Sequence, residues 1–323
     1  MKKKYSDTEY VYANARIHYA EGNLLTEEKY KKLDTCESTE EFRQILFECG
    51  YETKKYDIFT SVEKKLEENF DFASSLIKNS EILHIMRLPY ECNNIKGAMK
   101  CSLVKGFDYE NIFSACGIST LEQCEKAVKD NDYSFLYPHM KEACKGLIEK
   151  YAETKDPQMI DIPLDVACLE DMYDIAKDSK EKNLLAYVKD RIDILNVKNA
   201  IRLAEMMKDD DFADKVYIKN GDIDKKVIDE IREDVGNLSV CVKNTKFENL
   251  LQNTPKGFSD LERKFEYYLD NEMDKYRMSM FGCEPVLRYM YVCETESRRI
   301  RTLFSSLSSR LIKSKEKKGG RNE

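Results

Sequence analysis

The sequence predicts an all-α protein made of three related helical domains, each of about 100 residues. Charged residues make up 35% and hydrophobic residues 42% of the 323 positions, but only 12 residues are Gly and 6 are Pro. Sandwiches and barrels need more of these turn-forming residues, so the composition favours helices. The chain is also long enough to form two or three modest cores.

An internal repeat predicts the division into domains. Three segments share an acidic residue, then Asn or Arg three positions later, then a basic residue two positions after that. We call these segments the first, second and third triplets: Glu91, Asn94 and Lys96; Asp193, Asn196 and Lys198; Glu296, Arg299 and Arg301. Asn94 to Asn196 is 102 positions and Asn196 to Arg299 is 103, which is the size of a small domain. A truncated fourth copy, Asn14-Ala-Arg16, lies near the start of the chain.

Apolar residues recur every three or four positions in the long segments, which is typical of a helix with one buried face. In the first repeat they are Val62, Leu66, Phe70, Ala73 and Ile77; in the second they are Ile194, Val197, Ile201 and Ala204. Helix starts are predicted at Ser/Thr-x-x-Glu sequences, where the hydroxyl and the carboxylate can satisfy free backbone amides. These begin at Ser38, Thr60, Ser119 and Ser259.

Gly and Pro punctuate the repeats. Breaks between helices are expected near residues 53–60, 156–163 and 253–259, because Pro157, Pro163 and Pro255 do not fit a helix interior. Gly22, Gly106 and Gly221 each precede a short helical pattern and mark the start of a repeat. The predicted divisions are residues 1–105 (an N-terminal helix and repeat 1), 106–220 (repeat 2), 221–312 (repeat 3) and a basic disordered tail, 313–323.

The sequence lacks the usual signs of catalysis or ligand binding. It contains neither G-x-x-x-x-G-K-[ST] nor G-x-G-x-x-G, so we expect no nucleotide site, no cofactor and no ATP hydrolysis by this chain. His18, His84 and His139 lie far apart without ligand spacing, so no metal site is predicted. The eleven cysteines include no Cys-x-x-Cys pair, and we expect reduced, buried thiols.

Charge and hydropathy constrain location and partners. The net charge is −7, although the segment from Arg310 to Glu323 holds six Lys/Arg and two Glu, so the body is more acidic still. An acidic body argues against a nucleic-acid partner. Uncharged stretches such as Asn111–Leu121 are far shorter than the ~20 apolar residues that span a bilayer. The opening Met1-Lys-Lys-Lys-Tyr-Ser-Asp lacks the apolar core of a secretory signal, so we expect a cytoplasmic protein.

The triplets are the candidate functional residues. Their acidic residue and Asn lie three apart and share a helix face. Two interpretations are open: a buried Asn that bonds a neighbouring helix and keeps the repeats in register, or a face that contacts a partner. The candidates for partner-facing or domain-junction positions are Asn14, Arg16, Asn94, Lys96, Asn196, Lys198, Arg299 and Arg301.

Several segments together resemble the C subunit of the V/A-type (vacuolar/archaeal) rotary ATPases, a relative of the d subunit of the eukaryotic V-ATPase. The segments are Tyr10-Val-Tyr-Ala-Asn-Ala-Arg16-Ile, Glu21-Gly-Asn-Leu-Leu25, and Ser38 to Leu46 followed by Gly50-Tyr51. Glu294-Thr-Glu-Ser-Arg-Arg299-Ile-Arg301 is similar to the family's Glu-x-Glu-x-x-Asn-x-Arg signature, with Arg299 in place of Asn. The family often carries a Trp shortly before this signature, and this chain has no Trp.

The resemblance implies a mechanical role. In that family three domains form a funnel on the cytoplasmic face of the proteolipid ring, and the opening receives the central stalk. The chain would then be a non-catalytic adaptor, peripheral to the membrane through the ring, which transmits torque for ATP-coupled proton or sodium transport. Its partners would be the ring and the central-stalk subunits.

Two other classes of function are compatible with the residues. One is an all-α repeat scaffold that binds soluble proteins, although such arrays usually repeat every ~34–47 residues. The other is an all-α enzyme whose site is assembled from dispersed residues such as His84, Asp193 and Cys293.

Overall fold

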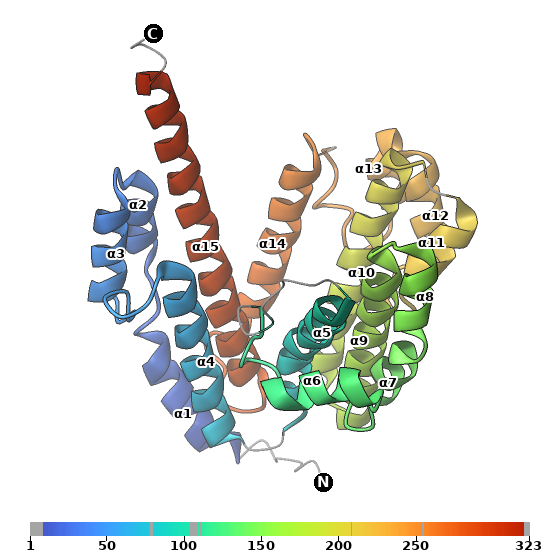
Figure 1. The fold of residues 1–323 in the computed structure, drawn as a ribbon, viewed down its shortest axis with the longest axis horizontal. Coiled ribbons are helices and arrows are strands. Elements are labelled where there is room, and N and C mark those ends of the chain that lie inside the picture. The colour runs from blue at the N-terminus through green and yellow to red at the C-terminus, as the bar shows by residue number, and fades with distance from the viewer. Residues whose placement is uncertain are drawn as a thin grey trace. The chain divides into compact units, whose positions relative to one another are not determined.

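The computed structural model describes residues 9–77, 80–103, 109, 112–207, 209–253 and 255–319, with residues 154 and 314–319 described by their backbone alone. Within these ranges every regular element is a helix (Figure 1). The prediction of an all-α fold is confirmed. The described residues form two compact units: unit 1 contains those up to Leu83 and from Met278 onward, and unit 2 contains those between His84 and Arg277. The division into three domains stays a prediction, and Gly106 lies outside the described residues.

Unit 1 is built around α15 (Glu284–Gly319), the long red helix of Figure 1. It packs against four helices from the start of the chain: α1 (Tyr10–Glu21), α2 (Glu27–Thr35), α3 (Thr39–Glu48) and α4 (Ile58–Leu76). The apolar stripe predicted from Val62 to Ile77 is buried. The core gathers residues from α2 to α4, their connections and α15: Tyr30, Leu33, Cys36, Phe42, Leu46, Tyr51, Ile58, Val62, Ile300 and Leu307.

The C-terminal helix is longer than the sequence analysis predicted. α15 continues through residues 313–319, where we expected the start of a disordered tail. This segment contains four Lys, one Glu and no Pro, and Lys and Glu are good helix formers. A helix that is already nucleated upstream can therefore extend through it, although the segment has little to bury.

Unit 2 starts with α5 (Glu81–Leu103), whose first residues belong to unit 1, and ends shortly after α14 (Phe258–Asp274). Two long helices of this unit, α9 (Gln158–Ser179) and α10 (Lys182–Glu205), pack together. The described connections between the long helices contain shorter helices: α6 (Leu121–Asp130), α7 (Pro138–Cys144), α8 (Leu147–Thr154), α11 (Asp210–Val216), α12 (Lys225–Glu233), the 3-10 helix η1 (Val235–Asn237) and α13 (Leu238–Cys241).

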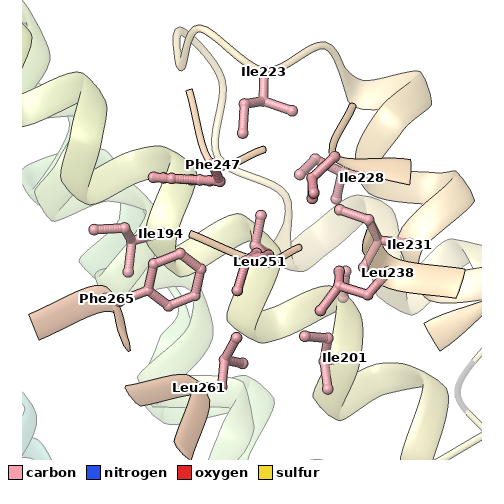
Figure 2. Packing of buried hydrophobic residues seen from close by; sticks show 13 residues of the cluster. Ile194, Ile201, Ile223, Ile228, Ile231, Leu238, Phe247, Leu251, Leu261 and Phe265 are labelled. Carbon is pink, nitrogen blue, oxygen red and sulfur yellow. The ribbon is translucent and has the colours of Figure 1, made fainter. Parts of the chain in front are cut away.

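A large core of unit 2 lies between α10, α12, α13 and α14 (Figure 2). Phe247 and Phe265 meet edge to face in this core, with ring centroids 5.0 Å apart. Ile194, Val197 and Ile201, three of the four residues of the stripe predicted for the second repeat, are buried in it. The helical period read from the sequence thus identified the face of α10 that packs.

Most predicted helix starts are displaced. Ser38 does cap α3, since its hydroxyl accepts the amide of Glu41. By contrast, α4 is capped by Asp57, whose carboxylate accepts the amide of Thr60. α6 is capped by Thr120 with a capping box to Gln123, and α14 begins after Gly257. A side chain three residues earlier, or one residue later, can satisfy the same free amides, so the motif alone does not fix the cap.

Pro163 does not mark a break. It lies inside α9, after Pro157 at the N-cap. A proline at this position removes one backbone hydrogen bond, which costs about 3 kcal/mol in an exposed helix. Here Ile160, Leu164 and Ala167 are buried on either side of it, and the burial of this face outweighs the loss. Pro255 lies in the connection before α14, as expected.

Candidate functional site

The first triplet, on α5, fixes the loop that follows its own helix. The Glu91 carboxylate oxygen Oε2 accepts the amides of Ile118 and Ser119 at 2.8 and 2.9 Å. Asn94 binds Ser114 twice, since its Nδ2 donates to the carbonyl and its Oδ1 accepts the amide, both at 2.8 Å. Both triplet side chains are almost completely buried. The side chains of the helix therefore hold the loop through the loop's backbone groups rather than through its side chains.

The second triplet, on α10, makes the same contacts. Asp193 accepts the amides of Asp222 and Ile223 at 3.0 and 3.1 Å. Asn196 accepts the amide of Ile218 at 3.0 Å and donates to its carbonyl at 2.8 Å. In both loops the residue bound by Asn is followed four and five positions later by the two amides bound to the acid. The repeat seen in the sequence is thus a repeat of contacts.

A glycine lies at the same place in each of these two loops, three positions after the residue that Asn binds. A Cβ atom on Gly117 would lie 2.7 Å from Nδ2 of Asn94 and 3.0 Å from Oε2 of Glu91. A Cβ atom on Gly221 would lie 2.0 Å from Oδ1 of Asp193. Glycine is needed here because the loop backbone approaches the acid closely.

Gly221 is one of the glycines expected from the sequence to mark a repeat start, whereas Gly117 is not. Gly117 follows Asn94 by 23 positions and Gly221 follows Asn196 by 25. This similar distance was the available signal, and it points to Gly117 rather than to Gly106.

The third triplet, on α15, departs from this arrangement. Glu296 accepts the amide of Leu25 at 2.6 Å and the hydroxyl of Tyr51 at 2.7 Å. Arg299 binds both carboxylate oxygens of Glu27, at 2.5 and 2.9 Å, and its guanidinium lies 3.6 Å from the centroid of the Tyr30 ring. The acid therefore still binds a backbone amide, whereas the Asn-to-backbone pair is replaced by an ion pair at the surface.

The basic residue of each triplet joins its helix to a long helix distant in sequence. Lys96 on α5 pairs with Asp165 on α9. Lys198 on α10 pairs with Glu262 on α14 at 2.7 Å, and Arg301 on α15 pairs with Glu63 on α4. Each pair lies within a single unit. The three basic residues thus share one feature, an ion pair with an acidic residue of another long helix.

The truncated fourth copy lies on α1 and behaves differently. Asn14 is fully buried, and its Nδ2 donates to the carbonyls of Met280 and Gly282 at 3.2 and 3.0 Å. It thus binds the segment just before α15. Arg16 is exposed, with its guanidinium 5.8 Å from the centroid of the Phe72 ring. The role of all eight candidate residues towards partners or domain junctions stays a prediction.

Unit 2 holds a lysine-centred network that the sequence analysis did not predict. Lys246 Nζ lies 2.6 Å from Asp190, 2.7 Å from Asp193 and 3.3 Å from Asp222. Burial opposes the charge of Lys246, but its bonds to Asp190 and Asp193 outweigh this and raise its pKa. The ammonium thereby neutralises the buried Asp193 carboxylate. No spacing rule connects Lys246 to Asp193, because they meet only through the fold.

Burial and charge act in opposite directions at the other triplets as well. Burial raises the pKa of Glu296, although its bonds to Tyr51 and Leu25 oppose the rise. At Lys96 burial opposes the charge, yet Cys92 and Asp165 outweigh it and the pKa is raised. The hydrogen bond from Arg299 lowers the pKa of Glu27. These directions follow from desolvation and from the sign of the nearest charge.

The residues named for a dispersed enzyme site each have structural partners. Asp193 binds the loop amides described above, and the ring of His84 is hydrogen-bonded to the Tyr137 hydroxyl at 2.6 Å. Cys293 on α15 is hydrogen-bonded to Tyr289, and burial raises its pKa. Among the described residues no group of His, Cys, Asp and Glu is arranged to hold a metal ion. Within the same ranges no helix has the length and apolarity needed to span a bilayer.

Comparison with known protein families identifies the chain. The model of the ATP synthase (C/AC39) subunit family matches residues 13–317, which include all three triplets and the fourth copy. A search of curated proteins finds no match. Members of this family are subunits of the V/A-type rotary ATPases, in agreement with the resemblance recognised in the sequence. The match covers nearly the whole chain, which therefore belongs to the ATP synthase (C/AC39) subunit family.

Proposed function

We propose that this chain is the non-catalytic central-stalk adaptor of a V/A-type rotary ATPase or ATP synthase. It links the proteolipid membrane ring to the central rotor stalk and transmits torque for ATP-coupled proton or sodium transport. The observation that carries the proposal is the family match over residues 13–317. In this proposal the chain lies on the cytoplasmic face of the membrane and is held there through the ring.

The triplet contacts support a mechanical role, because a torque-bearing body must resist deformation. Each triplet helix is fastened to a backbone amide elsewhere in its unit and to a second long helix. The acidic residues that hold the amides are buried, where hydrogen bonds are less exposed to competition from water. Such fastenings link helices far apart in the sequence and oppose sliding between them.

The recurring contacts also support the proposed division into three related domains, which in this proposal form a funnel. α5, α10 and α15 each combine an acid that binds backbone amides with a base that binds another long helix. Arg16, Lys198 and Arg301 keep part of their surface exposed. We assign these three cations, rather than the buried Asn residues, as the first candidates for contact with the stalk or ring.

The decisive experiment compares ion transport with ATP hydrolysis in vesicles. Vesicles depleted of this chain should still hydrolyse ATP but should not drive ion uptake, and adding back the purified chain should restore uptake. The purified chain alone should show no ATPase activity. A torque-bearing contact should bury more than the ~1,000 Å² that marks a specific interface. Depleted vesicles that pump at the full rate per ATP hydrolysed would contradict the proposal.

A further inference from the structure

Helices α2, α3 and α4 share a core to which α15 contributes one side. Ile300 and Leu307 of α15 are fully buried in the cluster formed by α2, α3 and α4, and Leu303, Phe304 and Leu311 pack against it. The Phe304 ring contacts Phe42 of α3 and Phe59 of α4, with centroids 5.4 and 5.6 Å away. Without α15, the apolar faces of α2 to α4 would be open to water.

Buried polar groups depend on the same helix. Glu296 of α15 binds the Leu25 amide, between α1 and α2, and the Tyr51 hydroxyl, between α3 and α4. Asn14 of α1 is completely buried, and its amide donates to carbonyls in the segment that leads into α15. Separation of α15 from α1 to α4 would deprive these groups of their hydrogen-bond partners within the protein.

Four arginines on α15 complete the attachment. Arg288 pairs with Glu21 of α1, Arg299 with Glu27 of α2 and Arg301 with Glu63 of α4. Further along, Arg310 donates to the carbonyl of Asp34 at the end of α2, at 2.8 Å. The polar contacts of α15 thus extend from Arg288 to Arg310 and reach α1, α2 and α4.

We infer that α1 to α4, although they precede α15 by more than 200 residues in the sequence, become folded only together with α15. Unit 1 then opens and closes as one cooperative unit, separately from unit 2, whose core between α10 and α14 contains no residue of α15. One consequence concerns synthesis. Helices α1 to α4 remain incompletely packed until α15 has been made, so only a chain that includes α15 presents a folded unit 1.

Native-state hydrogen exchange of the full chain, followed by mass spectrometry, tests this inference. Leu307→Ala removes apolar contacts from α15 in unit 1. Leu261→Ala is the matched control, because both leucines are 1% exposed on a helix and Leu261 belongs to the core of unit 2. Leu307→Ala should accelerate exchange at least ~30-fold across α1 to α4 as well as α15. Protection of α9 and α10 should change less than ~3-fold.

Leu261→Ala should show the reverse, with faster exchange in unit 2 and unchanged protection in α1 to α4. Acceleration confined to α15 in the Leu307 variant would overturn the inference, since α1 to α4 would then be stable alone. Equal acceleration of both units in either variant would also overturn it, because the chain would then unfold as a single body.

If Leu307→Ala does not fold, Ile300→Val replaces it in the same exchange experiment. Ile300 is completely buried on α15, and a loss of one methylene group should accelerate exchange across α1 to α4 by roughly 2- to 12-fold. The same spatial distribution is expected, and the same two outcomes would overturn the inference.

Discussion

Asn196 binds both backbone groups of Ile218: it accepts the amide at 3.0 Å and donates to the carbonyl at 2.8 Å. This geometry imitates a backbone pair of a β-ladder inside an all-helical fold. Only a side-chain amide offers a donor and an acceptor in this arrangement. The same pairing by Asn94 at Ser114 shows that the residue type is dictated by the loop backbone it has to satisfy.

Removal of this amide should destabilise unit 2. In Asn196→Ala the amide and carbonyl of the buried Ile218 lose their partner, so the free energy of unfolding should fall by about 1–3 kcal/mol. In Asn196→Asp the free energy of unfolding should fall at least as far, because a carboxylate would then face the Ile218 carbonyl. Urea unfolding measures both, with Asn199→Ala on the same helix as the control, expected within about 0.5 kcal/mol. Equal effects at positions 196 and 199 would contradict the assignment.

The glycine of the second loop should not tolerate a side chain. A Cβ atom in Gly221→Ala would overlap Oδ1 of Asp193 at 2.0 Å, and the loop must move away from its acid. We expect a loss of about 1–3 kcal/mol. The control is Gly236→Ala, where the nearest atom is at 3.4 Å and φ is not in the left-handed region. That change should be neutral or slightly stabilising. Thermal unfolding of both variants measures the difference.

Charge reversal separates a structural role of Lys198 from a partner-binding role. Lys198→Glu places a carboxylate against Glu262, now 2.7 Å from the lysine, and should cost about 1 kcal/mol while the chain stays folded. The exchange Lys198→Glu with Glu262→Lys should restore stability. Assembly with the stalk and ring should be weak in both variants if Lys198 faces a partner. Recovery of assembly in the exchanged pair would show that the lysine acts only within unit 2.

Replacement of Arg299 by Asn, the residue of the other two triplets, should remove an ionic contact. The pair with Glu27 is exposed, so the expected loss is below about 1 kcal/mol. Arg299 lowers the pKa of Glu27, so the wild-type contribution is present above the ordinary Glu pKa. It is lost as the pH falls through the lowered value. Stability should therefore depend less on salt and acid in Arg299→Asn. Identical salt dependence in both proteins would argue against the ion pair.

His139 should make unit 2 less stable as the pH rises past neutrality. It lies on α7 between Asp174 at 2.9 Å and Glu170 at 3.4 Å on α9. Burial lowers the pKa of His139, but its bond to Asp174 and the nearby carboxylates outweigh this, so the pKa is raised. The contribution is fully present below the unfolded value of about 6.5 and is lost above the folded one.

His139 is partly exposed, so its contribution should be about 0.5 kcal/mol. His139→Gln should flatten the difference in unfolding free energy between pH 5.5 and pH 8.5. The measurement is urea unfolding of both proteins at both pH values. A pH dependence unchanged in the variant would assign it to other groups.

The sequence predicted the features that depend on periodicity and spacing. The buried stripe on α4 was predictable from the 3.6-residue period of a helix. The triplets were predictable because they recur at intervals of 102 and 103 positions. The partners of the triplets were not predictable in this way. Glu91 binds loop amides, which carry no residue-type signal, and Lys246 reaches Asp193 only because the tertiary fold brings them together. Pro163 was wrongly expected to break a helix, because burial of the residues around it outweighs the low helix propensity of proline.

The connectivity of the two units has a mechanical consequence. Unit 2 is inserted into unit 1, so the chain passes between them twice: within α5 after Leu83, and after Arg277. A single covalent connection can act as a swivel, since rotation about its backbone bonds meets little resistance. Two separate connections cannot both turn without winding around each other. A twist applied to one unit therefore reaches the other through the covalent chain itself, even where no side chain joins them.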